Sequence, residues 1–123
     1  MGQIGKKLAE GIGKVTSVTV SERGNAVNVE NEVEEFGTVL YTTTFGPAID
    51  EEGTTGPISI HGQIFLPDGS TVPWSGGGAW HVIGQHKWEI KVINSLGNGD
   101  RHLVVEEYDL ATMSTKGTVY ELD

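Results

Sequence analysis

Residues 58–82 constrain the fold of this chain more than any other part of the sequence. They read ISIHGQIFLPDGSTVPWSGGGAWHV, in which two runs of alternating side chains flank the dipeptide Asp68-Gly69. An Asp-Gly pair between two alternating runs is the strongest short-range signal of a β-hairpin. The segment therefore predicts two antiparallel strands, with Gly69 in the turn in a positive-φ conformation.

Three consecutive glycines, residues 76–78, interrupt the second strand of this hairpin between Trp74 and Trp80. Glycine inside a strand weakens the pairing. It usually marks a bulge, a sharp bend or a place where another group approaches the backbone. The hairpin therefore predicts a curved antiparallel sheet with aromatic side chains beside the bend.

A hydrophobic period of two continues through most of the chain after Lys14. Val27, Val29 and Val33 alternate with acidic and amide side chains, which predicts a half-buried strand with an acidic outer face. About eight such strands follow one another at the spacing of a sandwich or barrel. Because closure removes exposed strand edges, we expect residues 1–123 to form a single all-β domain, an antiparallel β-barrel. A barrel of this size is either filled by side chains or holds one small ligand.

The segment 1–13 is the one part of the chain that favours a helix. Ile4, Leu8 and Ile12 recur at a spacing of four, which would place them on one helical face. Gly13 is suited to end such a helix. We therefore expect a short N-terminal helix or a frayed tail before the first strand.

The charge balance and the lack of cysteine exclude several functions. Seventeen acidic residues against eight basic ones give a formal net charge of −9, which would repel nucleic acid and anionic membrane surfaces. The absence of cysteine excludes disulfides and thiolate metal sites, and it fits a cytoplasmic protein. No apolar run is long enough to span a membrane. We expect neither a nucleic-acid partner nor a membrane span.

The four histidines, His61, His81, His86 and His102, lack the spacing of a zinc site. We therefore expect no metal and no cofactor. His61 lies in the glycine-rich hairpin, and burial would perturb its pKa if the side chain pointed into the barrel. A partly exposed position on a strand face is the alternative interpretation for each histidine.

Glu106 and Glu107 are adjacent in a predicted strand, so that one side chain points inward and the other outward. Val104, Glu106 and Tyr108 share one face. An inward glutamate beside aromatic side chains would have a raised pKa and could act as a general acid or base. The sequence favours partial solvation of both faces, because strongly perturbed carboxylates are a minority.

The three tryptophans, Trp74, Trp80 and Trp88, fall on the apolar phase of their strands. One interpretation is a plain aromatic core, and the other is an aromatic wall of a ligand cavity. The sequence around Ser75 lacks a nucleophile elbow, and no Lys-Ser/Thr pair follows the glycine run as in a phosphate loop. The sequence therefore identifies no catalytic residue.

Four stretches of the chain carry a family resemblance: IGKKLAEGIGKVTSVTV, GQIFLPDGSTVPWSGGGAW, HKWEIKVI and LVVEEYDLATMSTKGTVYEL. They are similar in pattern to small bacterial and archaeal proteins, which in turn resemble the allene oxide cyclase-like and dirigent-like β-barrels. The resemblance implies an eight-stranded antiparallel barrel, often oligomeric, with a hydrophobic cavity. Cyclases of this group act mainly by holding a reactive hydrophobic substrate in one conformation. None of their catalytic residues matches a position in this sequence.

The favoured hypothesis is a cofactor-free β-barrel that binds a small, largely apolar molecule. Its candidate binding residues are four aromatic side chains and two polar anchors: Tyr41, Trp74, Trp80, Trp88, His61 and Glu106. One alternative is a cofactor-independent cyclase or isomerase acting in the same cavity, and another is a structural or assembly protein with a filled barrel. A homo-oligomer is compatible with each hypothesis. A filled barrel would lack a pocket of ligand size, a binder would have one without a buried titratable group, and an enzyme would have both.

Overall fold

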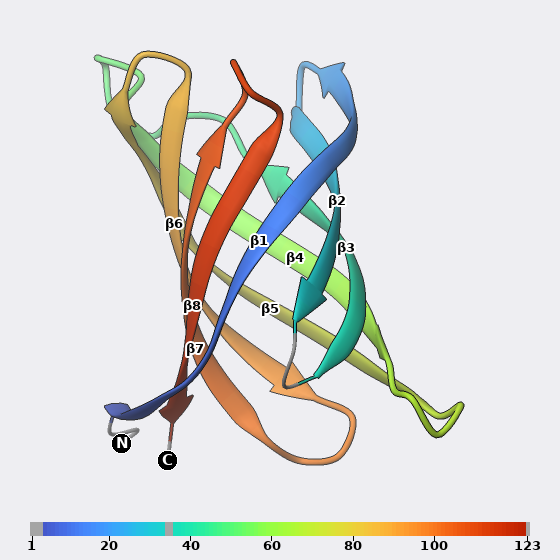
Figure 1. Ribbon diagram of the computed structural model, residues 1–123. Coiled ribbons are helices and arrows are strands. Elements are labelled where there is room, and N and C mark those ends of the chain that lie inside the picture. Colours follow the sequence, from blue (N-terminus) through green and yellow to red (C-terminus); the bar gives the residue numbers. More distant parts are fainter. Residues whose placement is uncertain (1–3, 34–35, 123) are drawn as a thin grey trace.

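The computed structural model describes residues 4–33 and 36–122, which form eight antiparallel strands in one closed barrel (Figure 1). Each strand pairs with its two neighbours in the sequence, and the first pairs with the last to close the ring. The strands are β1 (Ile4–Ser21), β2 (Gly24–Val33), β3 (Gly37–Phe45), β4 (Thr55–Phe65), β5 (Thr71–Gly84), β6 (Lys87–Leu96), β7 (Arg101–Asp109) and β8 (Ser114–Leu122). The prediction of a single all-β barrel is therefore confirmed. None of the described residues belongs to a helix long and apolar enough to cross a membrane.

The hairpin between β4 and β5 has the turn that the sequence predicted. Gly69 has a φ of +92°, and the turn is closed by a 2.9 Å hydrogen bond from the Leu66 amide to the Ser70 carbonyl oxygen. The Asp68 carboxylate also accepts a 2.9 Å hydrogen bond from the Ser70 amide. The short polar side chain thus stabilises the turn locally, as aspartate commonly does.

The N-terminal helix predicted within residues 1–13 is wrong for the described residues from Ile4 onward, because these form the first part of β1. Residues 4–14 pair with β8, and residues 13–21 pair with β2. The strand is therefore the element that closes the barrel. The hydrogen bonds and burial gained by closure outweigh a weak helical preference, which glycines at residues 5, 11 and 13 had already lowered.

The glycine run in β5 contains no bulge, which corrects that part of the prediction. The register of β5 with both neighbouring strands is continuous through residues 76–78, and it shifts only between Val82 and Gly84. At Gly76 and Gly78 the backbone lies too close to the next strand for a side chain. A Cβ atom on Gly78 would lie 1.9 Å from the Lys91 carbonyl oxygen, and one on Gly76 would lie 2.1 Å from the Asn94 Oδ1 atom.

The core is formed by the side chains that alternate inward along every strand. On β2, for example, Val27, Val29 and Val33 are buried while Glu30 and Glu32 are exposed, as the alternation predicted. The loops that join the strands lie alternately at the two ends of the barrel. In Figure 1 the chain termini and the β2–β3, β4–β5 and β6–β7 turns share the lower end, and the remaining connections form the upper end.

Candidate functional site

The barrel interior contains a cavity at each end. We call the cavity near the chain termini the lower chamber, and the one at the opposite end the upper chamber. A layer of buried side chains that line neither chamber separates them: Val15, Val29, Thr43, Ile58, Ile90, Val92, Tyr108 and Thr115. The barrel is therefore filled in the middle and hollow at both ends.

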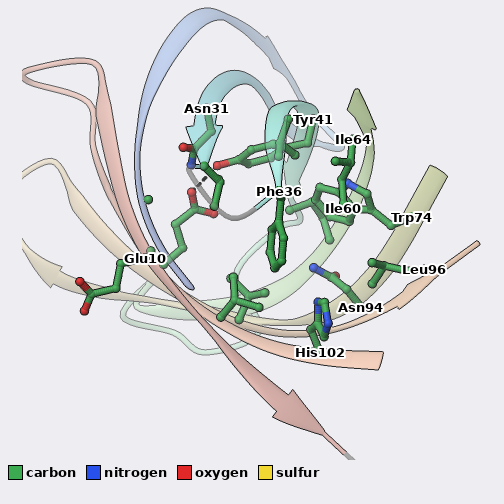
Figure 2. A pocket seen from close by; sticks show the side chains of 17 residues that line it. Glu10, Asn31, Phe36, Tyr41, Ile60, Ile64, Trp74, Asn94, Leu96 and His102 are labelled. Atoms are coloured by element: carbon green, nitrogen blue, oxygen red, sulfur yellow. Dashed lines mark hydrogen bonds between the residues drawn. The ribbon is translucent and has the colours of Figure 1, made fainter. Parts of the chain in front are cut away.

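The lower chamber has mainly apolar walls and a few polar side chains (Figure 2). Its volume is about 80 Å³, which corresponds to two or three water molecules at about 30 Å³ each. The buried polar side chains in its walls come from four different strands and are Asn31, Tyr41, Asn94 and Glu106. The surrounding apolar side chains include Val33, Val39, Ile60, Ile64, Leu96, Val104 and Val119.

Glu106 is the centre of a buried hydrogen-bond network. The Tyr41 hydroxyl donates to its Oε2 atom at 2.5 Å, and the Tyr108 hydroxyl donates to its Oε1 atom at 3.0 Å. The Thr43 hydroxyl extends the network through a 2.6 Å hydrogen bond with the Tyr108 hydroxyl. The Thr115 hydroxyl lies near the same carboxyl group but has no hydrogen-bond partner. The network holds the Glu106 carboxyl group in one orientation at the inner end of the lower chamber.

The sequence-based preference for a partly solvated Glu106 is wrong. Its side chain is buried, with 3% of its surface exposed, whereas Glu107 is exposed on the outer face. Burial raises the pKa of Glu106, and the hydrogen bonds from Tyr41 and Tyr108 only partly oppose this effect. Burial and the neighbouring carboxyl group raise the pKa values of Tyr41 and Tyr108 well above their usual range, so both phenols remain hydrogen-bond donors.

Several polar atoms in the chamber wall have no hydrogen-bond partner. They are the Oδ1 atoms of Asn31 and Asn94 and the Nε1 atom of Trp74. Asn31 lies beside the Tyr41 hydroxyl, and the Asn94 side chain points into the chamber (Figure 2). Buried polar groups without partners cost stability, so they are rare in proteins and are concentrated where they serve another purpose. This arrangement makes the lower chamber a candidate binding site.

Two stacked rings lie at the outer end of the lower chamber. The ring centroids of Phe36 and His102 are 5.9 Å apart, with an interplanar angle of 6°. Burial lowers the pKa of His102, and the carboxylate of Asp100 partly opposes this shift. Burial therefore favours the neutral imidazole. Both side chains line the lower chamber.

The candidate residues from the sequence separate into three groups. Tyr41, Trp74 and Glu106 line the lower chamber, whereas Trp80 and Trp88 line the upper chamber. His61 is exposed on the outer face of β4 and lines neither chamber. The three tryptophans all lie on the inward phase of their strands, but they do not converge on one cavity.

Sequence reasoning missed Asn31, Asn94, Phe36 and Tyr108 as members of the site. Asn31 and Asn94 sit at inward positions of β2 and β6, in phase with Val29 and Val92. A lone amide on the apolar phase of a strand is the signal that could have identified them. Phe36 belongs to a turn, where the period of two gives no guidance.

Among residues 4–33 and 36–122, no group of three or more His, Asp or Glu side chains could hold a metal ion. Comparisons with protein-family models, curated proteins and solved structures found no match for this chain.

Proposed function

We propose that the protein binds a small, largely apolar molecule in the lower chamber and recognises one polar group of that molecule. The observation that supports this proposal is the convergence of the Glu106 carboxyl group, the Tyr41 hydroxyl and two amide side chains in a chamber with apolar walls. Apolar side chains at these positions would make a more stable core. A few polar groups in an apolar cavity are the usual means of orienting a ligand.

The size of the chamber restricts the ligand or requires an opening. A volume of about 80 Å³ is below the 150 Å³ or so that holds a benzene molecule. A larger ligand therefore extends outward past Phe36 and His102 or displaces their rings. Displacement of the pair costs about 0.5–1.5 kcal/mol of stacking in addition to the lost burial of the two rings, which the bound ligand has to replace.

The distribution of tryptophans allows a direct test of this proposal. Trp74 lines the lower chamber, while Trp80 and Trp88 line the upper one. We expect a panel of small alcohols, phenols, terpenoids and fatty acids to include a ligand that changes the fluorescence of the wild-type protein. The change should persist in Trp88→Phe and disappear in Trp74→Phe. It should be accompanied by a rise in melting temperature that depends on ligand concentration.

Two outcomes would count against binding in the lower chamber. One is the absence of any fluorescence or stability change with the whole panel. The other is a change that persists in Trp74→Phe and disappears in Trp88→Phe, which would assign the ligand to the other end of the barrel.

A second candidate function is cofactor-independent isomerisation or cyclisation, with Glu106 as the acid or base. It is supported by a carboxyl group of raised pKa that lines a largely apolar chamber and is oriented by two phenols. A base that removes a carbon-bound proton exchanges it with solvent. Incubation of bound terpenoid ketones from the panel, which carry protons on the carbon beside a carbonyl group, in D₂O should therefore show deuterium incorporation by NMR. Glu106→Gln should abolish it and Trp88→Phe should not; equal incorporation in wild type and Glu106→Gln would exclude this role.

A further inference from the structure

The upper chamber is a second cavity that the proposed function does not use. Its volume is about 230 Å³, and its walls include Val27, Phe45, Trp80, Trp88 and Leu110. A cavity of about 150 Å³ is sufficient for benzene. The upper chamber is therefore large enough for a small organic ligand without any rearrangement.

Three aromatic rings are held at defined angles around this chamber. The Phe45 ring centroid lies 6.4 Å from that of Trp80 and 6.4 Å from that of Trp88, with interplanar angles of 51° and 67°. The Trp80 indole donates a 2.9 Å hydrogen bond from Nε1 to the Gly46 carbonyl oxygen, which fixes its orientation. All three side chains line the chamber, so a ligand inside it is able to contact more than one ring.

The charge around the upper chamber is negative. Glu22 lines the chamber, and none of the described residues that line it is Lys, Arg or His. The acidic residues 50–52 belong to the β3–β4 loop at the same end of the barrel (Figure 1). Of the basic residues at this end, Lys87 lies 3.9 Å from the Asp109 carboxylate, Arg23 adjoins Glu22 in the β1–β2 turn, and His86 lies in the β5–β6 turn. The surplus of acidic groups attracts cations and repels anions.

We propose that the upper chamber binds a small alkylated ammonium cation of the trimethylammonium type, taken up from solution. A cation within about 6 Å of an aromatic ring centroid, over the ring face, is attracted by the ring quadrupole, and tryptophan gives the strongest attraction. The alkyl groups of such a cation pack against the apolar walls, and Glu22 balances its charge. A neutral molecule of the same shape makes only the apolar contacts, so positive charge is the property that the site selects.

A pair of isosteric probes separates charge from shape. Choline and 3,3-dimethyl-1-butanol have the same shape but differ by a nitrogen cation in place of a carbon atom. We expect isothermal titration calorimetry of the complete chain to give about tenfold tighter binding of choline. The affinity for choline should also fall as salt is added. Equal affinity for the two probes, or no binding of choline, would overturn the proposal.

Variants of Glu22 and Trp88 test the acidic group and the aromatic wall of the upper chamber separately. Glu22 is exposed in a turn, so Glu22→Gln should fold normally and weaken choline binding about threefold, with no change for the neutral isostere. Trp88→Leu should weaken choline binding about tenfold, whereas Trp88→Phe should retain most of it because a ring remains. Trp74→Phe, at the other end of the barrel, is the matched control and should leave choline binding unchanged. Unchanged affinity in both Glu22→Gln and Trp88→Leu would overturn the assignment.

A third probe identifies the source of the cation. Phosphocholine carries the same trimethylammonium group with a phosphate attached, as in a lipid headgroup. The acidic residues at this end predict that choline binds more tightly than phosphocholine. Equal or tighter binding of phosphocholine would overturn the assignment to a free cation. These experiments are independent of the lower chamber, because its ligand is reported by Trp74.

Discussion

Glu106 is the residue on which the chemistry of the barrel interior depends. It is the one carboxylate among the described residues that is buried, and its two oxygen atoms accept hydrogen bonds from Tyr41 and Tyr108. No cation accompanies it within the network, so burial dominates and favours the protonated form. Its protonation state therefore links the stability of the whole barrel to pH.

The pH dependence of stability has a definite sign at this residue. The unfolded chain releases the Glu106 proton near the ordinary glutamate pKa of about 4.3, and the folded protein releases it at a higher pH. The stability due to this group is therefore complete below about pH 4.3, and it is lost as pH rises through the folded-state pKa. Glutamine keeps the shape but does not titrate. The free energy of unfolding of Glu106→Gln, measured in urea, should increase relative to that of the wild type as pH rises over this range. At higher pH the difference between the two proteins should become constant. A difference that is constant with pH would contradict the prediction.

The strand face on which the Glu106 side chain lies could be predicted from the sequence, but the burial of that side chain could not. The period of two correctly separates Glu106 from Glu107 and places it in phase with Val104 and Tyr108. Its burial depends on Tyr41, which lies 65 residues earlier in the chain. Only closure of the barrel brings these side chains together, and no local pattern encodes that contact. The unpaired amides of Asn31 and Asn94 are likewise buried only when the barrel closes, so no local pattern predicts their burial.

At the scale of single elements, the turn between β4 and β5 is the one that the sequence predicted most fully. A Cβ atom on Gly69 would have no neighbour within 4 Å, so only the φ of +92° resists a larger residue. We expect Gly69→Val to lower the free energy of unfolding by about 1 kcal/mol or more. Gly69→Asn should cost much less, because asparagine tolerates this conformation. Equal losses in urea unfolding for the two variants would mean that the backbone conformation is not the cause.

The glycine run of β5 gives a contrast between two adjacent positions. A Cβ atom on Gly78 would lie 1.9 Å from the Lys91 carbonyl oxygen, which is backbone and cannot rotate away. On Gly77 the nearest atom would be the Ile58 carbonyl oxygen at 3.3 Å. We expect Gly78→Ala to destabilise the protein by about 3 kcal/mol and Gly77→Ala by less than about 1 kcal/mol. Thermal unfolding measures both, and similar losses would show that strand spacing is not the reason for the glycines.

The strand β1 shows why the prediction of a helix failed. A spacing of four residues is close to the period of a helix, but it is also an even number and therefore fits one face of a strand. Ile12 lies on the outer face with 75% of its surface exposed, while the inward positions of this segment are taken by the small residues Ala9, Gly11 and Gly13. The spacing of apolar side chains on the outer face of this segment does not indicate which strand it pairs with. The hydrogen bonds with β8, contributed from the other end of the chain, decide the outcome.

At the scale of the whole molecule, the β1–β8 pairing closes the barrel, so we expect the barrel to unfold as one cooperative unit. Gly13 pairs with Thr115 and Ile12 with Lys116, so that closure joins the two ends of the sequence. We expect the β1 amides that are hydrogen-bonded to β8 within residues 9–14 to exchange with deuterium only through global unfolding. Their exchange free energies should match the free energy of unfolding from urea. Rapid exchange of these amides would contradict the pairing and restore the interpretation of a frayed tail.

The same pairing gives the molecule a property that its linear sequence hides: the order of its strands is cyclic. Ile4 lies opposite Leu122, and every other neighbouring pair of strands is joined by a short connection at one end of the barrel. A circular permutant, with Leu122 linked to Ile4 and new termini between residues 49 and 53, would keep the complete ladder of hydrogen bonds. Surface loops tolerate such cuts. We expect this permutant to fold with an unchanged far-ultraviolet circular dichroism spectrum, and the strand that begins its chain would then be β4.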